Sequence, residues 1–189
     1  MKGITLASIT KASIVTAALF GAGQVMADCV PVKGKILNTL HDPALGSTYV
    51  EALGQYIRGA STIGVVSLNG EKPIGNLKCA LVGVAVGKGE DPGNGLPALP
   101  SFEHSISCDD QIESPYGIEH SQLLLDTSGQ FTGFDGATTL YFVEHSTPRS
   151  GSGTGVFAGT TGGALTIEGT SNLATKSIDM KFYGEICMD

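Results

Sequence analysis

Short runs in which apolar and polar residues alternate, separated by turn residues, most constrain what this chain can fold into. Val30, Val32 and Ile36 alternate with lysines, and the apolar run 63–68 ends at Asn69-Gly70, a strong turn dipeptide. Beyond residue 27, no segment shows a long apolar period of 3.6 residues. The pattern therefore predicts an all-β protein.

The alternating runs predict eight strands, at residues 30–36, 63–68, 77–86, 101–108, 118–126, 139–145, 163–169 and 178–186. The run 77–86 is nearly all apolar, so we expect both of its faces to be covered. Segment 46–57 fits either a strand or a short helix. Glycines inside strands, such as Gly34 and Gly83, suit the tight bends of a small barrel.

These features predict a closed antiparallel barrel of about eight strands, with a β-sandwich as the alternative. An outer-membrane barrel is a third architecture, but it would carry aromatic girdles, and aromatic residues make up only 6% of this chain.

Residues 1–27 have the pattern of a secretory signal peptide. Lys2 and Lys11 supply the positive charge, residues 13–22 form a short apolar stretch, and Val25-Met26-Ala27 resembles a cleavage site. The stretch is too short to cross a bilayer. We therefore predict export to the periplasm or the medium, with residues 28–189 forming a single domain.

The predicted mature chain is acidic, with a net charge of −9. Such a surface repels phosphate backbones, so nucleic acid is not expected as a partner. No other apolar run is long enough for a membrane helix, so no integral membrane segment is expected. The oligomeric state stays open.

All four cysteines lie in the predicted mature domain, and an even count in an exported protein indicates disulfides. Three pairings are possible. We predict Cys29–Cys187, which would join the two ends of the domain, and Cys79–Cys108, which would close the Gly- and Pro-rich loop 87–100.

The segment 153–162, Gly-Thr-Gly-Val-Phe-Ala-Gly-Thr-Thr-Gly, is followed by an expected strand and, at 182–186, by a last one. This arrangement resembles the later half of the allene oxide cyclase-like barrels, which include the dirigent proteins, over residues 126–186. The resemblance implies an eight-stranded, calycin-like barrel that binds an apolar small molecule inside, with isomerase- or cyclase-like chemistry in some members. No catalytic residue of that family can be matched to this chain.

The tripeptide Glu-His-Ser occurs three times and contains three of the four histidines: His104, His120 and His145. Each histidine shares a predicted strand face with apolar residues, because side chains alternate along a strand. If these faces line the barrel, the three imidazoles converge inside it. They are then the candidate catalytic residues, as acids or bases.

Three converging histidines would also suit Zn²⁺ or another transition metal, so a metal-dependent enzyme is the alternative to a binding protein without a cofactor. A purely structural or surface protein is the second alternative. Whether the chain is an enzyme stays open. The candidates for contacting an apolar ligand are the aromatic residues Phe102, Tyr141, Phe157 and Phe182.

Overall fold

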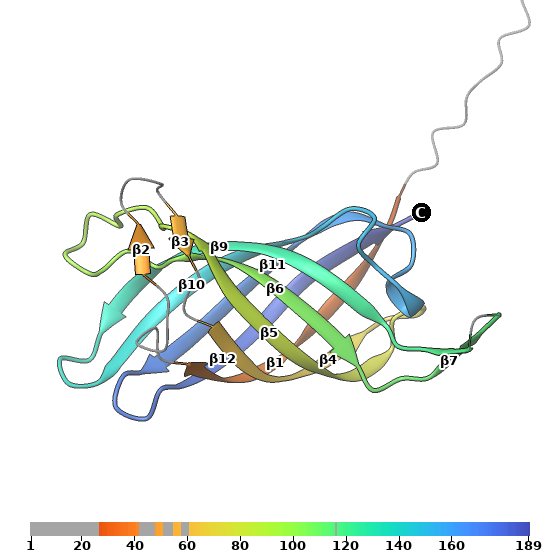
Figure 1. Cartoon of the computed structure of the whole chain (residues 1–189), viewed down its shortest axis with the longest axis horizontal. Helices are drawn as coiled ribbons and strands as arrows, with labels where there is room; N and C mark the ends of the chain where they lie inside the picture. The colour runs from red at the N-terminus through yellow and green to blue at the C-terminus, as the bar shows by residue number, and fades with distance from the viewer. Residues whose placement is uncertain (1–26, 42–47, 51–54, 58–60, 116) are drawn as a thin grey trace, which may run out of the picture.

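Eight long antiparallel strands form a closed barrel in the computed structural model, which describes residues 27–41, 48–50, 55–57, 61–115 and 117–189 (Figure 1). The prediction of an eight-stranded antiparallel barrel is therefore confirmed. The predicted signal peptide, except for Ala27, lies outside the described residues. Among the helices that the structure describes, none is long and apolar enough to cross a membrane.

The barrel strands follow one another around the wall nearly in chain order, and the last strand closes on the first. In order around the wall they are β1 (Asp28–His41), β4 (Ser61–Gly70), β5 (Asn76–Gly87), β6 (Ser101–Cys108), β9 (Gln122–Phe134), β10 (Thr139–Pro148), β11 (Thr160–Asn172) and β12 (Ser177–Met188). All eight predicted strands are present, most of them longer than expected.

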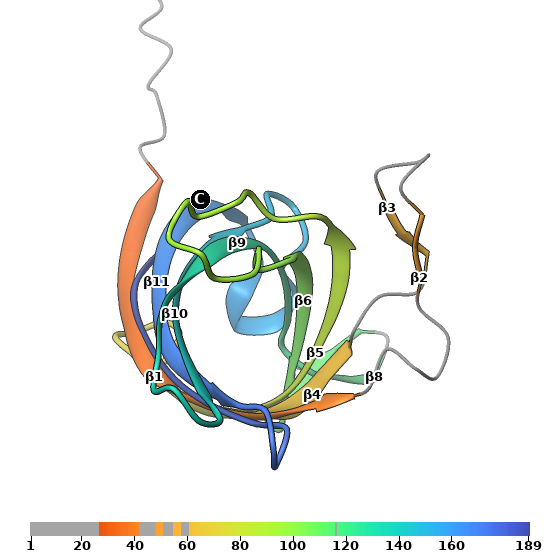
Figure 2. The same ribbon diagram turned by 90° about the vertical axis from the view of Figure 1, so that its left-hand side faces the viewer.

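Two small hairpins are not part of the barrel sheet (Figures 1 and 2). One pairs β2 (Thr48–Val50) with β3 (Gln55–Ile57), so the described part of segment 46–57 is strand. The other pairs β7 (Ile112–Ser114) with β8 (Gly117–Glu119) between β6 and β9. Residues 118 and 119 therefore belong to this hairpin, and β9 begins only at Gln122.

Alternation along each strand divides the side chains between an apolar inside and a more polar outside. In β12, for example, Ile178, Met180 and Phe182 are buried, whereas Asp179 and Lys181 are exposed. The expectation that both faces of β5 are covered is wrong. Its inner residues are buried, but the outward side chains of Val82, Val84 and Val86 are 41–48% exposed.

Inward-facing glycines make room for large side chains on the neighbouring strand. Gly34 pairs with Phe182, Gly83 with His104, and Gly129 with Glu144. A Cβ on Gly83 would lie only 2.5 Å from Cδ2 of His104. A small barrel has too little room for large residues at every inner position, so these pairs fix where the large side chains go.

Both predicted disulfides are present, and each joins directly opposite residues of neighbouring strands. Cys29–Cys187 links β1 to β12, where the barrel closes, and its cysteines lie toward the outside. Cys79–Cys108 links β5 to β6 and is buried. Two disulfides are typical of a protein that folds in an oxidising compartment.

One end of the barrel is capped by the short 3₁₀ helix η2 (Gly155–Phe157), which Figure 2 shows crossing the far end of the bore. Phe157 is fully buried there. The opposite end, nearest the viewer in Figure 2, lies beside the connection 88–100 and the turns 135–138 and 173–176.

Candidate functional site

Buried polar side chains from several strands lie inside the barrel. They take inward positions through the alternation of their strands; for example, Asn38 follows the buried Ile36, His104 follows Phe102, and Glu144 follows Phe142. The set is Asn38, Thr62, His104, Thr127, Glu144, Ser146 and Ser171. Buried polar groups are costly unless they are paired, so their partners decide what this region can do.

A cavity of about 150 Å³ opens among these residues near the uncapped end. Three phenylalanines, Phe102, Phe131 and Phe142, supply much of its apolar wall, and Leu99 from the connection 88–100 is buried against it. A smaller, almost entirely apolar gap of about 30 Å³ lies further along the bore. His104, Glu144 and Met180 line both spaces, so they mark where the two spaces meet.

His104 is hydrogen-bonded to the hydroxyl of Thr127, which is itself hydrogen-bonded to the hydroxyl of Ser146. Its Nδ1 lies 2.9 Å from Oγ1 of Thr127, which in turn lies 2.5 Å from Oγ of Ser146. The ring stacks on Phe102, with 5.5 Å between centroids, and its Nε2 edge faces Gly83 and Thr62. Burial lowers the pKa of His104 from 6.5 to about 4, so the imidazole is neutral near pH 7.

Glu144 is a buried carboxyl group without a partner among the described residues. Its side chain is 5% exposed and makes neither a hydrogen bond nor an ion pair with them. Desolvation alone raises its pKa from 4.5 to about 7. Both protonation states are therefore populated near neutral pH, which suits a group that binds or transfers a proton.

Two further side chains in the cavity are unpaired. Both the oxygen and the nitrogen of the Asn38 amide, and the hydroxyl of Thr62, are buried without a hydrogen-bond partner. Both residues line the 150 Å³ cavity, with 5% and 4% of their surface exposed. An unpaired buried polar group costs about 1–3 kcal/mol, so these atoms leave hydrogen-bonding capacity in the cavity wall that no described residue uses.

The prediction that the three histidines converge is wrong. Its premise was that the apolar residues beside each histidine face inward, but His145 shares the outer face of β10 with Tyr141. In the first Glu-His-Ser copy the histidine points inward, whereas in the third copy the glutamate and the serine do so. The repeats thus bring His104, Glu144 and Ser146 into the barrel, not three imidazoles.

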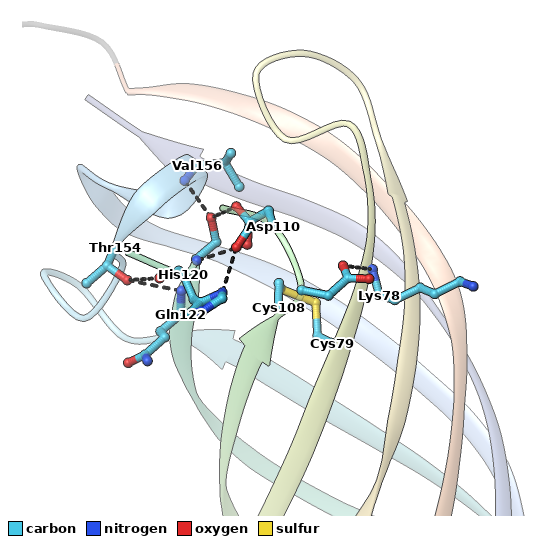
Figure 3. The surroundings of a disulfide bond; sticks show 10 residues. Lys78, Cys79, Cys108, Asp110, His120, Gln122, Thr154 and Val156 are labelled. Carbon is cyan, nitrogen blue, oxygen red and sulfur yellow. Dashed lines mark hydrogen bonds between the residues drawn. A yellow bond between two sulfur atoms is a disulfide. The ribbon is translucent and has the colours of Figure 1, made fainter. Parts of the chain in front are cut away.

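His120 lies at the capped end, outside the strands of the wall. Its Nδ1 is 2.6 Å from the carbonyl oxygen of Asp110, and the side chain is exposed. Figure 3 shows it near the Cys79–Cys108 disulfide, among hydrogen bonds that tie Asp110, Ser121 and η2 together. The Ser121 hydroxyl donates to Asp110 and accepts from the Val156 N–H. His120 belongs to this structural network.

The three-histidine metal site is not assembled, because His104 is inside the barrel and the other two are exposed on the outside. Within the described ranges, the one group of three potential ligand atoms is Cys29, Glu185 and Cys187. Its two sulfur atoms already form a disulfide. The premise of the metal-dependent alternative is therefore wrong.

Two of the four aromatic candidates line the interior spaces and two do not. Phe102 lines the larger cavity and Phe182 the smaller gap. Tyr141 is 45% exposed on the outer face of β10, so its prediction as an interior ligand contact is wrong. Phe157 is buried, but in the end cap, and it is not among the residues that line either space.

Sequence reasoning missed Asn38, Thr62 and Glu144. A signal for Glu144 was present, since Leu140, Phe142 and Glu144 form one alternating set that competes with Tyr141, Val143 and His145 for the inside. Two inward glycines also point to the site, because Gly129 is paired with Glu144 and Gly64 with Asn38. The pairing of residues between neighbouring strands, which is needed to interpret that signal, cannot be obtained from one sequence.

Fold and site together define the class as a hollow eight-stranded antiparallel barrel with a partly polar interior cavity. Comparison of the chain with protein-family models gave no match, and comparison with curated proteins and with solved structures gave none either. The function is therefore argued from the cavity itself.

Proposed function

We propose that this protein binds one small, mainly apolar molecule inside the barrel, with a polar group of that molecule at Asn38, Thr62 and Glu144. The observation that carries the proposal is the set of unpaired polar atoms in an otherwise apolar cavity. A solid core has no use for unpaired polar atoms, whereas a binding site needs a few of them to orient its ligand.

The size of the cavity limits the ligand. A dry apolar cavity of about 150 Å³ is large enough for a benzene molecule. The larger cavity here has about that volume, and the 30 Å³ gap lies beyond it. The proposed ligand is therefore a single ring, or a short branched chain, with one small polar substituent.

The setting we propose is that of an exported binding protein. The two disulfides and the signal-peptide pattern of residues 1–27 support export to the periplasm or the medium. We also keep the allene oxide cyclase-like relationship as a proposal, supported by the closed barrel and by Phe157 buried in the Gly-rich cap.

Thermal unfolding with toluene tests interior binding. A ligand at ten times its Kd stabilises the folded state by about 1.4 kcal/mol, which raises Tm by roughly 3–5 °C. Ser171→Leu fills the cavity from β11 and should abolish this shift, because Ser171 is buried in the cavity wall. Ser105→Leu adds the same side chain to the exposed face of β6 and should keep it.

The outcome that rules out interior binding is equally clear. It is a toluene shift that survives in a folded Ser171→Leu variant, or the absence of any shift in the unmodified protein with toluene and with benzyl alcohol.

A second function, proton transfer on the bound molecule, is favoured by Glu144. A carboxyl group with a pKa of about 7, beside a neutral imidazole in an apolar cavity, can give and take a proton near neutral pH. The ligand that raises Tm most can be followed by NMR with the protein in D₂O. Isomerisation or deuterium incorporation that stops in Glu144→Gln would establish catalysis, and an unchanged ligand would establish binding alone.

A further inference from the structure

We propose that the polar group of the ligand is an ammonium ion, held by the carboxylate of Glu144 inside the barrel. This inference rests on the proposed interior binding and names the chemical class of the ligand. It predicts a small amine with an apolar body, in place of a neutral or acidic compound.

The first argument is charge balance. A buried carboxylate is costly unless a positive charge lies beside it. None of the described residues that line the two interior spaces is Lys or Arg. His104, the other titratable side chain among them, is neutral near pH 7. The described lining residues therefore supply no cation for Glu144, whereas an ammonium ligand does.

The second argument is hydrogen-bond complementarity. Oδ1 of Asn38 and Oγ1 of Thr62 are buried without a hydrogen-bond partner, and the Glu144 carboxyl group makes no hydrogen bond to a described residue. All of these oxygen atoms accept hydrogen bonds. An ammonium group offers three N–H donors and no acceptor, so it satisfies such a site. Among the described buried side chains, the Asn38 nitrogen is the one amide donor without a partner. An anionic ligand would meet the Glu144 carboxylate with like charge.

The third argument is the aromatic wall. Phe102, Phe131 and Phe142 line the same cavity as Glu144 and Asn38. Phe131 and Phe142 meet edge to face, with 6.3 Å between centroids. Aromatic faces attract cations, and the attraction is larger where water is excluded. The same rings provide an apolar surface for the body of the ligand.

Ammonium binding requires Glu144 to be ionised, which sets a pH dependence. Below its pKa of about 7 the carboxyl group must lose a proton for the amine to bind. Affinity should therefore rise with pH and become constant above about pH 7. His104 does not titrate in this range, and the described lining residues of the other strands carry no further ionisable group.

Titration calorimetry with three matched probes tests the inference: benzylamine, benzyl alcohol and benzoate. Benzylamine, which stays protonated from pH 5.5 to 8, should bind the unmodified protein at pH 8 at least about tenfold more tightly than benzyl alcohol. Benzoate should bind least. Lowering the pH to 5.5 should weaken benzylamine binding by roughly 30-fold, because only about 3% of a group with a pKa of about 7 is then ionised.

Glu144→Gln keeps the size of the side chain and removes its charge. It should reduce benzylamine affinity to that of benzyl alcohol and abolish the pH dependence. Glu71→Gln, in the exposed turn after β4, makes the same charge change away from the cavity and should behave like the unmodified protein. Since the pH series uses the unmodified protein, the inference stays testable even if Glu144→Gln does not fold.

Two results would overturn the proposal in different ways. If benzyl alcohol binds as tightly as benzylamine at both pH values, the amine inference is wrong and interior binding stands. If none of the three probes binds, and toluene does not shift Tm, then the proposed function is wrong as well.

Discussion

Glu144 and His104 are the two ionisable side chains among the described residues that line the barrel interior, and burial shifts their pKa values in opposite directions. It raises the pKa of the acid to about 7 and lowers that of the imidazole to about 4. Both groups are thereby driven toward their neutral forms. The neutral forms lower the cost of burying both groups in the empty barrel. The proposed ammonium ligand would restore the ionised form of Glu144.

These two shifts predict how folding stability depends on pH. Glu144 ionises at a lower pH in the unfolded chain than in the folded one. Its contribution to the free energy of unfolding therefore falls as pH rises from 4.5 to about 7. His104 becomes protonated at a higher pH in the unfolded chain than in the folded one. Its contribution to the free energy of unfolding therefore rises as pH increases from about 4 to 6.5. Between pH 4.5 and 6.5 the two slopes should nearly cancel.

Urea unfolding of Glu144→Gln separates the two effects. With the acid removed, the free energy of unfolding should rise between pH 4.5 and 6.5 by up to about 3 kcal/mol, because the His104 contribution is no longer opposed. His104→Gln should show the reverse slope, and Glu71→Gln should stay as flat as the unmodified protein. A flat profile in Glu144→Gln would contradict the assignment of these two groups to the dry interior.

The candidate site shows what residue patterns in one chain can and cannot predict. The Glu-His-Ser repeat correctly drew attention to β6 and β10, and it contains His104, Glu144 and Ser146. The sequence did not show which residue of each tripeptide faces inward. Both faces of β10 carry large apolar residues, with Leu140 and Phe142 inside and Tyr141 outside. Which face of β10 is buried follows from its pairing with β9 and β11 in the closed barrel.

At the level of elements, strand periodicity predicted nearly the whole fold. Alternation identified all eight wall strands, and the cysteine count with their positions predicted both disulfides. Two details differed: β9 begins at Gln122 and not at residue 118, and the outward Val82, Val84 and Val86 of β5 made that run resemble a strand covered on both faces. Local composition cannot distinguish a covered strand from a wall strand with an apolar outer face.

The surroundings of two glycines on β5 predict different effects on stability when each is replaced by alanine. Gly83→Ala adds a Cβ within 2.5 Å of His104 and of Oγ1 of Thr62, so it should destabilise the fold by about 1–3 kcal/mol. Gly87→Ala, four residues along the same strand, meets nothing nearer than 4.0 Å and should change stability by less than about 0.5 kcal/mol.

Chemical denaturation of the two glycine variants checks this difference directly. Equal stability of Gly83→Ala and Gly87→Ala would contradict the close approach between β5 and the ring of His104. Gly83→Ala should also weaken benzyl alcohol binding, because the displaced imidazole and Thr62 both line the cavity.

On the scale of the whole molecule, the barrel has two different ends. Phe157 and the Asp110–Ser121–Val156 hydrogen bonds close one of them, and the cavity lies near the other, where Leu99 packs against it. The Cys29–Cys187 disulfide fastens the first strand to the last. The apolar core fills most of the interior, and the cavity is left at the end away from the cap.

The central claim is that the interior of the barrel is the binding site, and a crystal soaked with iodobenzene tests it most directly. Iodine scatters anomalously, so its position can be read without bias from the protein. We expect one iodine peak inside the barrel, in the cavity lined by Phe102, Phe142 and Glu144. An interior filled by side chains or ordered water, with iodine only on the outer surface, would contradict the claim.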